Sequence, residues 1–177
     1  MNQSNHQREA SSLRTRNSRP VETIEYRSIL DLPVLTSDED PASAKTVSGV
    51  KMDFEDQRVK ALVLSDKGRP SWEIPPSTLA EQREEAIIAP SREAVKPLRR
   101  GEGRLLFGKQ NDLIGATVTN SQGLQQGTVD NFWFLKSGTI LFYELSRGWL
   151  RDLLSGKEKI YPDEVKSVFP RMLVLQH

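Results

Sequence analysis

The 177-residue sequence contains no cysteine. Disulfide bonds, a thiolate nucleophile and a zinc–thiolate site are therefore excluded, and cysteine usage gives no information about the compartment. The sequence also lacks any apolar run that approaches the roughly 20 residues of a membrane-spanning helix. Its first residues are polar throughout, so no secretory signal pattern is present. We therefore expect no membrane span and a cytoplasmic protein.

Histidine is nearly absent, and neither sign of charge is in clear excess. The two histidines are His6, in a polar stretch, and His177, the final residue, where packing cannot orient an imidazole as a base or metal ligand. Lysine and arginine total 25 against 24 acidic residues. This balance argues against the whole protein being a nucleic-acid binder, because such proteins usually show a clear basic excess. Because no residue pattern predicts a catalytic site, a metal or a cofactor, we expect a protein that is not an enzyme.

What the sequence does contain is two β-rich segments between polar ones. Residues 1–25 hold almost no aliphatic side chains and are expected to form a disordered tail, since too little apolar area is available to offset the entropy of ordering. Residues 26–90 form a first module and residues 111–177 a second. Between them, residues 91–110 are rich in arginine, lysine, glycine and proline, which predicts a basic linker.

Each module shows short strands joined by tight turns, and the pattern repeats. In the first module, KTVSGVKMD (45–53) and VKALVL (59–64) predict two strands, with a bulge at Ser48-Gly49 where the apolar phase changes. The second strand matches residues 140–145 at an offset of 81, and I-x-P-x-x-L of residues 74–79 recurs as I-x-P-x-x-V 86 positions later. The repeat predicts two copies of one small β module.

The second copy carries an insertion that the first copy lacks. Residues 147–155 (RGWLRDLLS) place Trp149, Leu150, Leu153 and Leu154 at i, i+1, i+4 and i+5, which is one face of a short amphipathic helix. Closed barrels hide the edges of short strands. We therefore predict a mainly β fold of two small β-barrels in tandem, with a short helix inserted in the second and a disordered N-terminal tail.

The strand and turn motifs resemble those of the PRC-barrel family. The resemblance rests on Leu113-Ile114-Gly115, Asn120-x-x-Gly123, Gln126-Gly127-x-Val129 and Ile160-x-Pro162-x-x-Val165. The first module matches more weakly over residues 29–89, where Lys45 stands in place of Gly127. The best-known members are the H subunit of photosynthetic reaction centres and the C-terminal domain of a ribosome maturation factor. The resemblance implies tandem PRC barrels, a bacterial protein and a non-catalytic docking or assembly module that binds other proteins.

Surplus aromatic residues in the second module suggest where a partner would bind. Phe132-Trp133-Phe134 places rings on both faces of one strand, whereas a small barrel has a single interior. The outward rings need a cover, which is either the other module with the helix at 147–155, or a protein partner or second copy of the chain. The candidate protein interface comprises Phe132, Trp133, Trp149, Leu150, Arg151 and Leu153.

These patterns lead to two functional hypotheses. The first is a protein–protein docking or assembly adaptor that uses the candidate interface. The alternative is an RNA- or ribosome-associated maturation factor that uses the basic tail and linker, with a candidate patch of Arg92, Lys96, Arg99, Arg100 and Arg104. No aromatic residue is interleaved with these basic residues, as single-strand binding would favour.

Overall fold

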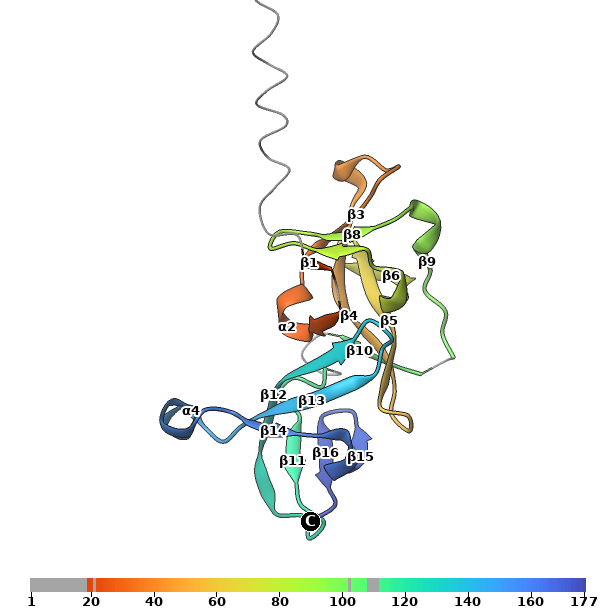
Figure 1. Cartoon of the computed structure of the whole chain (residues 1–177). Helices are drawn as coiled ribbons and strands as arrows, with labels where there is room; N and C mark the ends of the chain where they lie inside the picture. The colour runs from red at the N-terminus through yellow and green to blue at the C-terminus, as the bar shows by residue number, and fades with distance from the viewer. Residues whose placement is uncertain (1–18, 21, 102, 108–111) are drawn as a thin grey trace, which may run out of the picture.

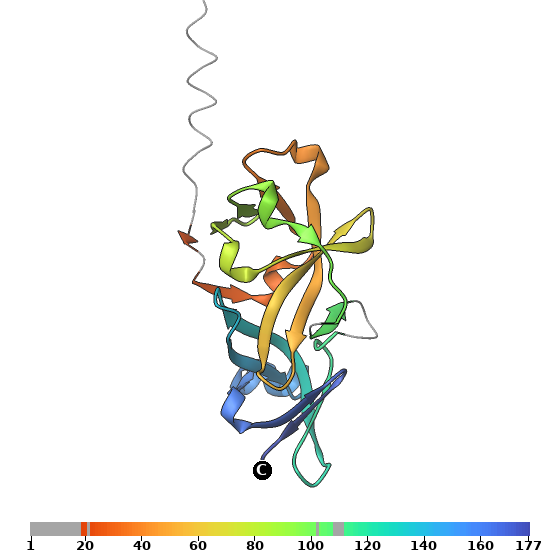
Figure 2. The same ribbon diagram turned by 90° about the vertical axis from the view of Figure 1, so that its right-hand side faces the viewer.

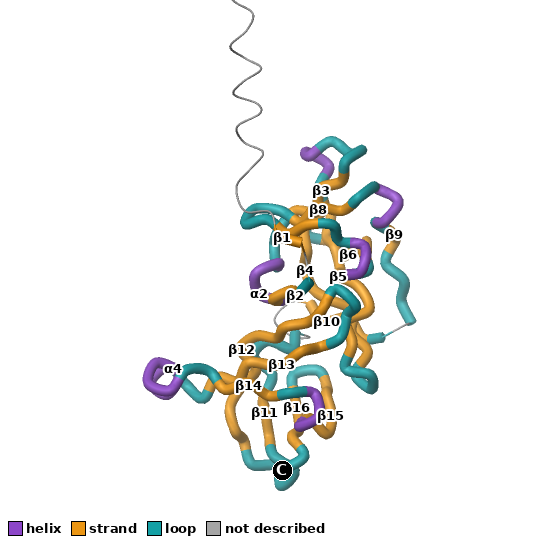
Figure 3. Tube along the Cα trace, viewed as in Figure 1, coloured by secondary structure: helices purple, strands orange, loops and turns teal. Residues whose placement is uncertain are grey.

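The structure, a computed structural model, is built from two curled, barrel-like sheets joined end to end (Figures 1 and 2). It describes residues 19–20, 22–101, 103–107 and 112–177. Strands dominate, and the helical segments between them are short (Figure 3). The expectation of a mainly β fold is confirmed. In the described ranges, no helix is long and apolar enough to cross a membrane.

Sheet A contains nine strands and sheet B seven. The strands of sheet A are β1 (Arg19–Pro20), β3 (Pro33–Thr36), β4 (Lys45–Asp53), β5 (Arg58–Asp66), β6 (Arg69–Ile74), β7 (Glu81–Gln82), β8 (Ile87–Ala89), β9 (Lys96–Pro97) and β10 (Arg104–Phe107). The strands of sheet B are β2 (Thr23–Glu25), β11 (Thr117–Thr119), β12 (Gln125–Leu135), β13 (Ile140–Ser146), β14 (Glu158–Ile160), β15 (Val165–Phe169) and β16 (Met172–Leu175). The α-helices are α2 (Tyr26–Ile29) and α4 (Trp149–Ser155); the 3-10 turns are η1 (Pro41–Ser43), η2 (Pro76–Thr78), η3 (Arg92–Ala94) and η4 (Pro162–Glu164).

The two sheets share one strand order, as the sequence repeat predicts. Sheet A runs β7-β8-β3-β4-β5-β6 and sheet B runs β15-β16-β11-β12-β13-β14, with one parallel pair in each, β3–β8 and β11–β16. The bulge predicted at Ser48-Gly49 is present as a register shift between Val47 and Gly49. Its counterpart in sheet B lies between Val129 and Asn131. These matched bulges extend the repeat from sequence spacing to hydrogen-bond register.

One equivalent turn was not recognised from the sequence. Gly115 has φ +78 and donates its backbone N–H to the carbonyl of Val129 at 2.7 Å. Asp31 has φ +63 and donates in the same way to Val47 at 2.8 Å. Aspartate is one of the few residues with a side chain that is enriched in this left-handed region, so the first module forms the turn without glycine.

The two modules exchange strands with each other. β2 precedes the first module along the chain but pairs with β12 of sheet B, where Ile24 lies opposite Phe134. β10 precedes the second module but pairs with β4 of sheet A, where Leu106 lies opposite Val50. Ile24 and Leu106 are fully buried, and the buried apolar residues of both sheets form one continuous cluster. The modules therefore share a single core.

This exchange corrects two expectations from the sequence. Residues 23–25 were assigned to a disordered tail, yet they form β2 because Ile24 completes the core beside Phe134; residues 1–18 and 21 lie outside the described ranges. The basic linker was expected to be irregular, yet it contributes β9 and β10, the latter pinned by buried Leu106. Both segments become strands because they pair with a strand of the other module, and local composition does not reveal that pairing.

Candidate docking surfaces

Phe132, predicted to be an interface residue, is part of the core. Its side chain is fully buried, and its ring stacks on Tyr26 of α2 with centroids 4.4 Å apart. The bulge after Val129 shifts the alternation, so that Asn131 and Phe132 are both buried in succession. The prediction for Phe132 is wrong because the bulge shifts the alternation of inward and outward side chains along β12, and Tyr26 of the first module covers the ring.

Trp133 lies instead on the outer face of sheet B, in what we call the aromatic row: Trp133, Phe142 and Tyr161. The rings of Trp133 and Phe142 stack with centroids 5.8 Å apart, and Tyr161 meets Phe142 edge-on at 6.3 Å. The Lys159 ammonium lies 4.4 Å from the Phe142 centroid, within the range of a cation–π contact. Trp133 and Phe142 are half-buried and Tyr161 is 50% exposed, so the row offers an accessible aromatic surface.

A charged network holds this part of sheet B against α2. Asp130 receives Arg27 at 2.8 Å and Lys157 at 2.6 Å, one on each carboxylate oxygen. Burial alone would raise the pKa of Asp130, but the hydrogen bonds and charges of Lys157 and Arg27 lower it below its usual range. The hydrogen bond to Asp130 also raises the pKa of Lys157. The base of the β13–β14 hairpin is thereby tied to the first module.

A buried amide completes the tie between the modules. Asn131, only 2% exposed, donates from Nδ2 to Glu25 Oε1 at 2.7 Å. Its Oδ1 accepts the backbone N–H of Arg27 at 3.1 Å and that of Phe132 at 2.9 Å. Every polar atom of this buried side chain therefore has a partner, as a stable core requires. The network orients the strands that carry the aromatic row and α4.

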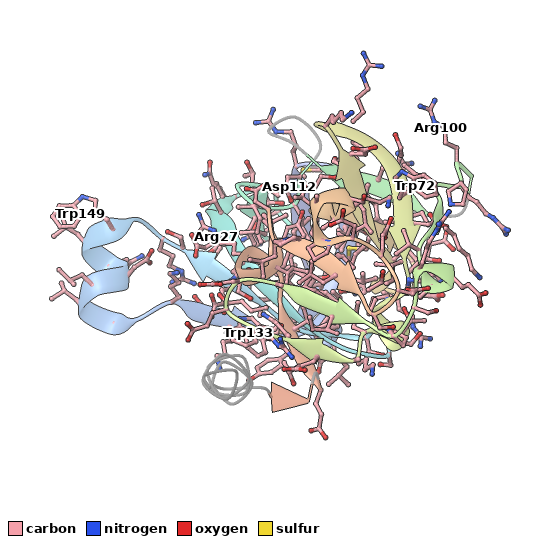
Figure 4. All side chains as sticks on the ribbon, turned by 90° about the horizontal axis from the view of Figure 1, so that it is seen from above. Arg27, Trp72, Arg100, Asp112, Trp133 and Trp149 are labelled. Carbon is pink, nitrogen blue, oxygen red and sulfur yellow. The ribbon has the colours of Figure 1, made fainter. Side chains whose placement is uncertain are left out.

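The helix predicted at 147–155 is present as α4, but it covers none of the outward rings. It projects from the β13–β14 hairpin, with Trp149 at its far side, whereas Trp133 lies against the body of the molecule (Figure 4). Its apolar face consists of Trp149, Leu150, Leu153 and Leu154, which are 74%, 57%, 75% and 82% exposed. Arg151 is exposed as well. The structure thus divides the candidate interface into two surfaces, the aromatic row and α4.

The five basic candidates of the linker do not gather in one groove. Arg92 lies in η3 and lines a cavity of about 850 Å³ together with Asp38, Glu39 and Glu93. Arg104 lies in β10, stacks over Phe54 with 5.9 Å to the ring centroid, and lines a separate cavity of about 630 Å³. Lys96, Arg99 and Arg100 are exposed on β9 and the loop after it. Acidic neighbours and separation both weaken an anion-binding surface.

The candidate interface drawn from the sequence did not include Phe142, Leu154, Tyr161 or Lys159. Phe142 had a usable signal, because it faces Trp133 across the β12–β13 pair and residues opposite each other share a face. Leu154 completes the helical spacing that begins at Trp149. Tyr161 and Lys159 gave no signal of this kind, since their placement depends on the path of the hairpin after α4.

Within the described ranges, no group of three or more His, Cys, Asp or Glu side chains is placed to hold a metal ion. No protein-family model matches the chain, and no curated protein matches it.

Proposed function

We propose that this chain is a non-enzymatic docking or assembly adaptor, cytoplasmic and built from two PRC-barrel-like modules. The single observation that carries the proposal is the apolar face of α4, whose four large side chains are 57–82% exposed. A contiguous apolar surface that is exposed to water marks an interaction site. The shared strand order of the two sheets supports the tandem arrangement that the family resemblance implies.

An adaptor needs two contacts, and sheet B offers two separate surfaces on one body. α4 is the projecting contact, and the aromatic row is the contact for a protein partner. Aromatic side chains are favoured anchors at protein interfaces, because they bury a large area at little entropic cost. The strand exchange and shared core join the two sheets into one body, and Asp152 ties α4 to Ser146 and Arg147 at the end of β13, which suits an assembly platform.

Capture of partners from native extract with the tagged full chain tests the proposal. The row variant is Lys159→Glu/Tyr161→Ser, which changes exposed side chains only. Its matched control is Lys166→Glu/Phe169→Ser, an exposed lysine and aromatic on β15 at the opposite end of sheet B. We expect a protein that is retained by the wild type and the control, lost by the row variant, and bound directly when purified. A partner retained equally by all three chains contradicts the proposal.

A further inference from the structure

α4 is an isolated apolar projection whose polar side is tied back to its own hairpin. Asp152 accepts the backbone N–H of Arg147 at 3.0 Å and the hydroxyl of Ser146 at 2.5 Å. Arg147 and Glu158 form an ion pair of 2.6 Å across the base of the hairpin. No residue of α4 is buried. Because these bonds fix the polar side inward, the apolar face is held away from the body before any partner arrives.

The surroundings of the apolar face are basic. Residues 147–159 contain four basic side chains (Arg147, Arg151, Lys157 and Lys159) and two acidic ones (Asp152 and Glu158), a formal charge of +2 in a chain whose total is +1. Glu158 pairs with Arg147, and Lys157 pairs with Asp130, whereas Arg151 and Lys159 form no ion pair with any described residue. An occupant of α4 therefore meets a positive rim and is favoured if it carries negative charge.

A second copy of the chain fits this surface poorly. The four side chains expose about 400 Å² in all, taking roughly 100–200 Å² for each when fully exposed. Two such faces together bury about 800 Å², below the roughly 1,200 Å² at which specific interfaces begin. The basic rims of two copies would also repel each other. A single short helix at a convex tip needs an occupant that encloses it and is anionic.

We propose that α4 is a peripheral membrane contact that docks onto an anionic lipid surface. The apolar face enters the boundary between headgroups and acyl chains, and Arg151, which is exposed on the same helix, meets the lipid phosphates. Tryptophan favours this boundary, an amphipathic helix lies in its plane, and basic residues nearby add electrostatic attraction to anionic lipid. Lipid needs no preformed groove, which suits a projecting tip. The inference rests on the proposed function, since it names the partner of the α4 contact.

Flotation of the full chain with vesicles tests this inference. The vesicles are phosphatidylcholine alone, or phosphatidylcholine with about a third of phosphatidylglycerol. We expect binding to the anionic vesicles that falls severalfold between about 0.1 M and 0.5 M salt, because screening weakens the basic rim. Arg151→Gln should weaken binding about fivefold. Trp149→Ala/Leu153→Ala, which removes two side chains about three-quarters exposed, should weaken it at least about tenfold.

Leu124→Ala is the matched control, because Leu124 is 61% exposed in the turn between β11 and β12, away from α4. It should leave vesicle binding unchanged. Absence of binding to anionic vesicles, or equal binding by the α4 variant and wild type, overturns the inference. The inference is also overturned if the lipid-free wild type sediments as a dimer and the α4 variant as a monomer. It is overturned as well if the α4 variant loses a captured protein partner but binds vesicles as the wild type does. These last two outcomes leave the docking proposal standing. If instead no captured protein depends on the aromatic row, the docking proposal fails and the lipid inference stands.

Discussion

Gly138 is the position where the seam between the modules is most sensitive to a single methyl group. It lies in the turn between β12 and β13 with φ +90, and a Cβ atom there would stand 2.1 Å from the carbonyl oxygen of Val59 in the first module. The backbone N–H of Val59 also donates to the Gly138 carbonyl at 2.8 Å. Gly138→Ala must therefore either push the modules apart or distort both chains at their contact.

The expected cost follows from these contacts. Relief of the overlap needs a displacement of about 1 Å, which breaks the Val59–Gly138 hydrogen bond. Val59 is only 2% exposed, so its N–H is left without water at a cost of about 1–3 kcal/mol. Positive φ adds about 1 kcal/mol for any residue with a Cβ. We expect Gly138→Ala to lower the free energy of unfolding by roughly 2–4 kcal/mol.

Gly123→Ala is the control that separates the two contributions. Gly123 has a similar φ of +82 in another turn of sheet B, but a Cβ atom there meets nothing within 4 Å. It should cost only about 1 kcal/mol. Urea unfolding followed by tryptophan fluorescence measures both variants, and an unchanged m-value shows that the two modules still unfold together. Equal costs for the two variants, within about 0.5 kcal/mol, would refute the close seating of Gly138 against Val59.

Two further predictions concern buried charge. The ammonium of Lys51, which is 3% exposed, lies 2.6 Å from the Glu73 carboxylate. Glu73→Gln removes this counter-ion and should lower the free energy of unfolding, measured in urea, by about 3–5 kcal/mol, whereas Lys51→Met/Glu73→Leu should be close to neutral. A double variant as unstable as Glu73→Gln would contradict this prediction. Burial raises the pKa of Asp112, so the wild type loses stability as the pH rises from about 4 through the folded-state pKa of this carboxyl. The free energy of unfolding of Asp112→Asn should then match or exceed that of the wild type at pH near 7, and this advantage should disappear below pH about 4. A variant that is less stable than the wild type by the same margin at both pH values would contradict the prediction.

Much of each module could be read from the sequence because its signals are local. The bulge at Ser48-Gly49, the turn at Gly123 and the apolar spacing of 147–155 each depend on residues within a few positions of one another. The repeat added the expectation that the two copies fold alike, whatever their strand order. These signals were sufficient for the mainly β fold and for the position of the inserted helix.

The remaining features depend on contacts that no local pattern encodes. β2 is three residues long and becomes a strand because Phe134, far along the chain, completes a core over Ile24. The burial of Phe132 depends on a bulge that shifts the alternation by one residue. For α4, the spacing shows that one face is apolar but not whether the protein covers it, and so the exposure of Trp149 is visible only in the structure.

The exchanged strands impose an order on biosynthesis. β10 follows β4 during translation, so sheet A can close as soon as Phe107 has left the ribosome. β2 leaves the ribosome much earlier but has to wait for residues 133–135 of β12, about a hundred residues later. Until then Ile24 lacks its cover, and a nascent chain arrested before Leu135 leaves this side chain without its partner strand. β2 is thus placed only once synthesis has reached the second module.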